Sequence, residues 1–305
     1  MLKYLIIQLD DTSVSFCHYE NRRAERRLMP LDVLKKAIFF AMKENLTIQM
    51  VYPDYDLPQE YLDAIDSIDH ADIVPAGRSG DVVVCSLDNI GAVDGVVALR
   101  TTRAELFARY GEIAEALSRK SRINVVITDL EQMTDADFAT YKAVLSSLAE
   151  SVKQLYAEGK TPQLNIITDR MMLTAMNNCN AGWESLTLAP DGKFYVCPAF
   201  YLEADGYSVG DLENGLDIKN PQLYQLDHAP ICRKCDAFHC RRCAWLNRRT
   251  TLEVNTPSHE QCVVAHLERN AARELLASIR TLGEFLPGNE IPEIDYLDPF
   301  ENNEK

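Results

Sequence analysis

The sequence predicts an α/β protein with a partial (β/α)6 barrel-like N-terminal domain, a loop-rich, cysteine-ligated C-terminal domain and a long C-terminal helix. Three observations favour this fold class. Strand-like and helix-like stretches alternate from residue 1 to about 170, the alternation stops after about 175, and seven of the nine cysteines lie between residues 179 and 262. Strands that alternate with helices indicate βαβ units and a parallel sheet.

The expected elements of the N-terminal half follow one another in a regular order. Runs of β-branched and other apolar residues predict strands, and apolar residues at helical spacing predict helices. The strands are expected at 4–9, 47–52, 81–87, 95–100, 123–130 and 163–170, and the helices at 31–46, 58–68, 104–120 and 135–159. About six such units fit either a partial barrel or an open sheet, and periodicity does not separate the two.

The C-terminal half lacks the regular alternation of strand-like and helix-like stretches. Asp191-Gly192 predicts a tight turn between the strand-like runs 186–188 and 193–196. The remaining segments are rich in loop residues and cannot bury much apolar area, so metal crosslinks are expected to take the place of a core.

A long helix is expected from about residue 258 to 285, because Pro257-Ser258 is a start signal and Pro287-Gly288 ends it. The expected domains are therefore 1–174, 175–286 and an acidic tail, 287–305, that is flexible or docked.

Composition and charge exclude several classes of protein. The 305 residues are 47% hydrophobic, which is enough for a sizeable core, and the net charge of −15 argues against a nucleic-acid partner. No run of 18 apolar residues is present, so no membrane span is expected. The first residues lack the features of a signal peptide and are typical of a strand. We therefore expect a cytoplasmic protein, where clustered cysteines usually bind metal.

The strongest motif is a pair of C-x-x-C units within twelve residues, formed by Cys232, Cys235, Cys240 and Cys243. Such pairs let two thiolates reach one metal from a tight loop. Zinc and an iron–sulfur cluster both take four thiolates, so the spacing leaves the metal open. A histidine, His239 or His266, could complete a further site, although His239 is interpreted as a surface residue.

The full cysteine array resembles the SPASM domain, the auxiliary-cluster domain of radical SAM peptide-maturing enzymes. The spacing C179-x12-G192-x4-C197, then C232-x2-C235-x4-C240-x2-C243, then C262 keeps the order of that domain, with each of the two middle gaps one residue shorter. The resemblance implies one or two [4Fe–4S] clusters, with Zn²⁺ as the alternative. The ligands it implies for one cluster are Cys232, Cys235, Cys240 and Cys262, and those for the other are Cys179, Cys197 and Cys243 with an unidentified fourth.

The N-terminal half resembles a radical SAM domain that has lost its catalytic ligands. Where a C-x3-C-x2-C motif is expected after the first strand, Cys17 is followed by Asn21 and Ala24. The segment after the second strand, V51-Y-P-D-Y-D-L-P58, also replaces the Gly-Gly-Glu-Pro-like motif that contacts S-adenosylmethionine (SAM). No catalytic residue and no SAM cofactor are therefore expected, and the chain alone is not expected to be active.

Residues 246–276 resemble the CXXX repeat peptide maturase family. The resemblance implies a non-catalytic or accessory subunit in the maturation of a Cys-rich, ribosomally made peptide, in a heterodimer with a true radical SAM enzyme. A zinc-stapled scaffold without a redox role is the alternative.

A third hypothesis is an enzyme that uses Cys17, His18 and Asp10 in the barrel mouth. Under the simpler interpretation, Asp10 and Asp11 cap a helix or are solvated, and Cys85 is an apolar strand residue.

Overall fold

The computed structural model describes residues 2–203 and 206–292. Two compact units make up the chain, and each draws on two separate stretches of sequence. The first unit comprises Met1–Val84 and Cys179–Ala229, and the second comprises Cys85–Asn178 and Pro230–Lys305. Both cross the predicted boundary at 174/175. Because a compact unit and a sequence-defined domain are different divisions, the predicted boundaries stay a prediction.

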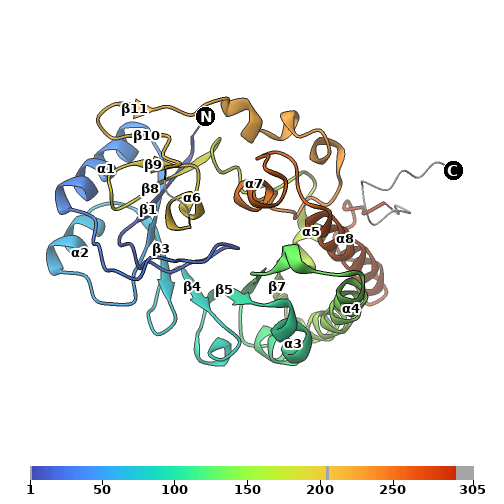
Figure 1. The fold of residues 1–305 in the computed structure, drawn as a ribbon. Helices are drawn as coiled ribbons and strands as arrows, with labels where there is room; N and C mark the ends of the chain where they lie inside the picture. The colour runs from blue at the N-terminus through green and yellow to red at the C-terminus, as the bar shows by residue number, and fades with distance from the viewer. Residues whose placement is uncertain (1, 204–205, 293–305) are drawn as a thin grey trace. The chain divides into compact units, whose positions relative to one another are not determined.

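The first unit is built on a mostly parallel sheet (Figure 1). Its strands are β1 (Tyr4–Gln8), β2 (Thr47–Val51), β3 (His70–Pro75), β4 (Val82–Cys85), β8 (Ser185–Leu188) and β9 (Phe194–Tyr195), in the order β4-β3-β2-β1-β8-β9. Strands β1 to β4 and β8 run parallel, and β9 returns antiparallel to β8. Four of the five residues of β1 are buried, as expected for a central strand covered on both faces.

Three helices, a short strand pair and two 3-10 turns are the other described elements of the first unit. They are α1 (Leu31–Lys43), α2 (Gln59–Ile65), α6 (Pro198–Leu202), the strand pair β10 (Gly210–Asp211) and β11 (Gly215–Leu216), and the 3-10 turns η3 (Pro221–Tyr224) and η4 (Leu226–His228). Helix α1 buries Leu34, Ala37, Ile38 and Ala41, the spacing of one helical face. Gly192 has a φ of +78°, which a tight β8–β9 turn requires and glycine adopts without strain.

The second unit has three parallel strands in the order β5-β6-β7: β5 (Val96–Thr101), β6 (Arg122–Ile127) and β7 (Gln163–Leu164). Its helices are α3 (Arg103–Leu117), α4 (Asp135–Ala157), α5 (Thr168–Met172), α7 (Ala244–Thr251) and α8 (His259–Arg280), and its 3-10 turns are η1 (Ile90–Ala92), η2 (Leu130–Gln132) and η5 (Cys232–Lys234). Capping boxes formed by Thr102 with Glu105 and by Thr134 with Asp137 begin α3 and α4. Helices α4 and α8 pack against each other (Figure 1).

The structure confirms the predicted α/β class with parallel strands, and it corrects several elements. Strand β3 was not expected, and the strand predicted at 163–170 is only β7 followed by α5. The predicted hairpin after residue 175 is present, but β8 also joins the parallel sheet beside β1. The long C-terminal helix ends at Arg280 rather than near 285.

The tail begins as a docked segment, since Arg280 donates to the carbonyls of Leu286 and Asn289. The tail beyond residue 292 lies outside the described residues.

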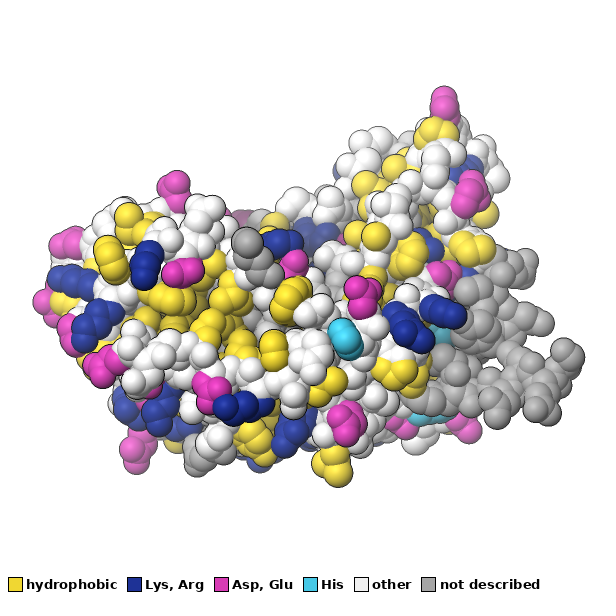
Figure 2. Space-filling view, turned by 90° about the horizontal axis from the view of Figure 1, so that it is seen from above, with side chains coloured by type: hydrophobic (Ala, Val, Ile, Leu, Met, Phe, Trp, Pro, Cys, Tyr) yellow, Lys and Arg dark blue, Asp and Glu magenta, His cyan; other side chains and the backbone are white. Residues whose placement is uncertain are grey.

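None of the helices in residues 2–203 and 206–292 combines the length and apolar content that crossing a lipid bilayer requires. On the face drawn in Figure 2, Lys and Arg side chains are interspersed with Asp and Glu rather than gathered by sign. That face therefore offers no basic stripe of the kind that follows a phosphate backbone.

Candidate metal centre

Four of the predicted ligands surround one small cavity in the second unit. Cys232 and Cys235 lie at turn η5, Cys240 follows on the same loop, and Cys262 lies in the first turn of α8. All four line a cavity of about 20 Å³, together with the polar side chains Asn178, Arg242 and His266 and the apolar side chains Met176, Ile231, Ala237, Pro257 and Ala265. The structure thus brings together the four cysteines that the resemblance assigns to one cluster.

The cavity is a poor place for free thiolates. Burial and the neighbouring Cys240 raise the pKa of Cys232 to about 12, and burial raises the pKa of Cys240 to about 11. Burial also raises the pKa of Cys235. A metal cation would reverse this preference, because thiolates are the form that binds metal and their charge is then neutralised.

The thiols surround the cavity rather than meeting at one point. Within the part of the chain that the structure describes, no three His, Cys, Asp or Glu side chains converge closely enough to hold a single ion as they stand. Four cysteines around one cavity, Cys232 and Cys262 buried and Cys235 and Cys240 half-buried, are nevertheless the donor set that an iron–sulfur cluster requires. A zinc ion would need the four sulfurs to draw closer.

The loop between Cys235 and Cys240 is held by two consecutive side chains of α8. Arg269 Nε donates to Asp236 Oδ2 at 2.7 Å, and Glu268 Oε2 lies 3.0 Å from His239 Nε2. His239 is 7% exposed, so its interpretation as a surface residue was wrong. Its partner Glu268 is also buried, which gives this contact a strong electrostatic character.

Arg269 and Glu268, which hold Asp236 and His239, are here called the clamp on the cysteine loop. Further side chains of the second unit contact the clamp or the loop. Tyr141 of α4 donates to Glu268 Oε1 at 2.6 Å, and burial together with the Glu268 carboxylate holds the pKa of Tyr141 well above its usual value. Arg170 of α5 donates to the carbonyl of Asp236 at 2.6 Å and lies over the Phe238 ring. Helices α4, α5 and α8 therefore fix the loop that carries the thiols.

The other three predicted ligands have different surroundings. Cys243 is not among the described residues that line the cavity, and its sulfur accepts from the N–H of Leu246 as the N-cap of α7. Cys179, which is exposed, and Cys197, the half-buried N-cap residue of α6, belong to the first unit. The second cluster site stays a prediction.

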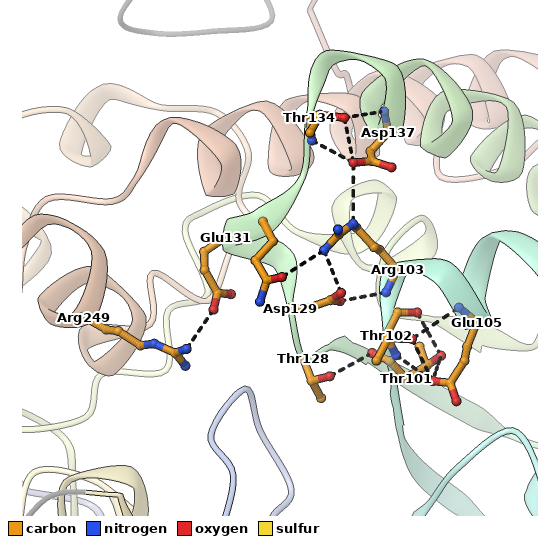
Figure 3. A network of polar contacts seen from close by, with 11 residues as sticks. Thr101, Thr102, Arg103, Glu105, Thr128, Asp129, Glu131, Thr134, Asp137 and Arg249 are labelled. Carbon is orange, nitrogen blue, oxygen red and sulfur yellow. Dashed lines mark hydrogen bonds and ion pairs between the residues drawn. The ribbon is translucent and has the colours of Figure 1, made fainter.

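Polar contacts in the second unit surround the starts of α3 and α4 and reach the last turn of α7 (Figure 3). Arg103 pairs with Asp129 at 2.8 Å, beyond the carboxyl ends of β5 and β6, and Glu131 pairs with Arg249 of α7 at 3.2 Å. These ion pairs were not predicted from the sequence. The capping signals at Thr102 and Thr134 were visible in the sequence, but the pairing across elements was not.

The loop that would carry a SAM-cleaving cluster is closed by Asn21. Its Nδ2 donates to the carbonyls of Asp11 at 2.7 Å and Ser13 at 3.1 Å, and its Oδ1 accepts the N–H of Arg23 at 2.9 Å. A bridge between Asp10 and Leu28 ties the base of the loop. The residue at this ligand position therefore has a structural role of its own.

Asp10 and Asp11 are not the capping or solvated acids that the sequence suggested. They are 0% and 6% exposed. Asp10 accepts hydrogen bonds from Thr12 and, at 2.7 Å, from the hydroxyl of Tyr55. Asp11 accepts one from the hydroxyl of Tyr201. These contacts occupy the oxygens of Asp10, so the hypothesis of a site formed by Cys17, His18 and Asp10 gains no support.

Replacing Asn21 by alanine is expected to lower the free energy of unfolding by about 1–3 kcal/mol, because two carbonyls lose their donor. Urea denaturation measures the loss. Arg22→Ala, at the exposed neighbour, is the matched control. Equal stability of the two variants would show that Asn21 does not hold the loop.

No protein-family model matches the chain, and no curated protein matches its sequence. Solved structures do match its fold. Native anSMEcpe with bound AdoMet aligns with a TM-score of 0.61 and 12% identity, over 91% of this chain and 99% of that chain. Streptococcus suis SuiB bound to precursor peptide SuiA aligns with a TM-score of 0.52 and 14% identity, over 86% of this chain and 76% of that chain.

The chain shares the fold of anSMEcpe and of SuiB. The likeness to anSMEcpe covers 91% of this chain and therefore extends over most of both units. At this identity the likeness concerns the fold, and the chemistry of this chain must be argued from its own residues.

Proposed function

We propose that the chain is an accessory subunit in the maturation of a Cys-rich, ribosomally made peptide, and that it carries at least one [4Fe–4S] cluster. One observation carries the proposal. Four buried or half-buried cysteines line a single cavity, whereas Asn21 at the position of a SAM-cleaving ligand is engaged in hydrogen bonds to the backbone. The chain keeps the donors of an auxiliary cluster and lacks those of a catalytic one.

The residues that would hold the cluster are Cys232, Cys235, Cys240 and Cys262. A bound cluster would supply one-electron transfer or a fixed anchor for the loop. The chain's own contribution is to bury the thiols among apolar side chains and to fix their loop through Asp236 and His239. A second cluster at Cys179, Cys197 and Cys243 is part of the same proposal.

A zinc-stapled scaffold is the second candidate. The same four thiols fit the tetrahedral preference of Zn²⁺, and a site without redox chemistry would still stabilise the loop. Metal and sulfide analysis of anaerobically purified protein separates the two candidates.

The proposed partners are a Cys-rich precursor peptide and a true radical SAM subunit. Two similar structures contain a peptide: SuiB is bound to the precursor peptide SuiA, and one form of anSMEcpe contains the Cp18Cys peptide. We infer that this chain also engages a peptide in the cytoplasm. Its net charge of −15 favours a partner with a basic face, mainly through the rate of association.

Reductive cleavage of SAM tests the accessory role. Several structures with this fold contain bound AdoMet, so binding and cleavage must be measured separately. With reductant under anaerobic conditions, the chain alone is expected to form no 5′-deoxyadenosine, because Asn21 and Ala24 cannot ligate iron. Release of 5′-deoxyadenosine would contradict the proposal.

Light scattering of the chain co-expressed with the radical SAM subunit tests the partner. A stable heterodimer is expected. Separate species at micromolar concentration, with and without the peptide, would remove the partner from the proposal.

A further inference from the structure

His266 lies on α8 one turn after Cys262 and faces the thiols. It is 3% exposed, it lines the cysteine cavity, and its Nε2 is 3.4 Å from Cys235 Sγ. Residues four apart on a helix share a face, so the backbone of α8 presents Cys262 and His266 to the same space. The imidazole is therefore a buried polar group placed directly beside the thiols.

Cys235 is the thiol that this group approaches. Its sulfur also accepts the N–H of Ala237 at 3.4 Å, so two polar groups of the protein converge on it. Cys235 precedes Asp236, which Arg269 holds in place. The loop that carries the sulfur is therefore tied to α8, the helix that carries the imidazole.

Once a metal is bound, the protonation state of the thiol decides which of the two groups donates the hydrogen bond. A metal-bound thiolate has lost its proton and can only accept a hydrogen bond. The imidazole nitrogen facing it must then carry the hydrogen. We propose that His266 is a positioning residue of the metal site, whose Nε2–H donates a hydrogen bond to the Cys235 thiolate and thereby retains the metal. This inference rests on the proposed metal function of the four thiols.

Loss of the donor should weaken metal retention. Removing a group that hydrogen-bonds a metal ligand typically costs about 10–100-fold in metal affinity. His266→Leu is therefore expected to lose its metal to a chelator about 10–100-fold more readily than the unmodified protein. His266→Gln keeps an N–H donor and is expected to stay close to the unmodified protein.

The experiment uses the full chain, purified anaerobically with its metal, and follows metal transfer to a chelator. Glu274→Gln, at an exposed position of the same helix, is the control. Far-UV circular dichroism of each metal-free variant checks that the fold is retained. His266→Leu equal to the unmodified protein overturns the proposal. So does His266→Gln as weak as His266→Leu with the fold intact, because that pattern indicates direct ligation by the imidazole.

The same data separate this proposal from the proposed function. Zinc in place of iron, with the expected order of the His266 variants, would remove the iron–sulfur function and support the role of His266. Iron and sulfide in the protein, with metal retention unchanged in both His266 variants, would support the iron–sulfur function and overturn the role of His266. A chain that binds neither metal would overturn both.

A spectroscopic readout adds a second test if iron is bound. Hydrogen bonds to cluster sulfurs contribute to the reduction potential, and they favour the reduced, more negative state. The midpoint potential of His266→Leu is therefore expected to lie below that of the unmodified protein, with His266→Gln between the two. An unchanged potential in His266→Leu contradicts a hydrogen bond to the cluster ligand.

Discussion

Replacing Glu268 by alanine is expected to lower the free energy of unfolding by about 3–5 kcal/mol, which is the usual effect of breaking a buried charged contact. Glu268 is 8% exposed and serves two partners at once, Tyr141 at 2.6 Å and His239 at 3.0 Å. The variant leaves a buried hydroxyl and a buried imidazole without their acceptor, far from water.

Urea denaturation of the purified chain measures this effect. Glu274→Ala removes a carboxylate from an exposed position of the same helix and should change stability by about 0.5 kcal/mol or less. Glu268→Gln, which keeps one acceptor oxygen, should fall between the two. A loss in Glu268→Ala no larger than that in Glu274→Ala would show that the clamp on the cysteine loop is not a stabilising feature.

Replacing Cys240 by alanine is expected to abolish metal binding at the cavity. The four thiols would bind one iron each of a [4Fe–4S] cluster, or all four a single zinc ion, and the variant removes one of these ligands. Because the binding free energy of a structural metal adds to the stability of the fold, the variant should also unfold at a lower denaturant concentration than the metal-bound protein.

Cys85→Ala is the matched control for this prediction. Cys85 is a buried cysteine, 4% exposed, and it lies at the end of β4, among neither the residues that line the cavity nor the predicted ligands. Its replacement should leave the metal content unchanged. Metal retained at full stoichiometry in Cys240→Ala, or lost in Cys85→Ala, would show that the cavity thiols are not the ligands.

The sequence predicted which cysteines share a cavity, but it could not predict the clamp that holds them. The spacing of Cys232, Cys235 and Cys240 is local, and the resemblance to a known domain supplied Cys262. Glu268 and Tyr141, in contrast, are 127 positions apart. A charged residue on an amphipathic helix usually faces solvent, so nothing local marks Glu268 as buried.

Other buried polar residues were misread for the same reason. Asp10, Asp11 and His239 are of residue types that are mostly exposed, and only tertiary contacts give them partners. The acceptors and donors they use, such as Tyr55 and Tyr201, come from distant segments.

Strands that consist of long apolar runs were predicted from the sequence. Strand pairings between segments far apart in the sequence were not. The run 163–170 has the composition of a strand, yet the hydroxyl of Thr168 bonds both the N–H and the carbonyl of Leu164 and turns the chain into α5. Strand β8 pairs with β1 across most of the sequence, which no local pattern reveals.

Metal and sulfide analysis of the anaerobically purified chain, together with its visible spectrum, tests the central claim most directly. The account predicts a brown protein with about four iron and about four sulfide per cavity cluster, and loss of that cluster in Cys240→Ala. Colourless protein with stoichiometric zinc would contradict the iron–sulfur assignment. Iron and sulfide content that is undiminished in Cys240→Ala would contradict the assignment of the cavity as the site.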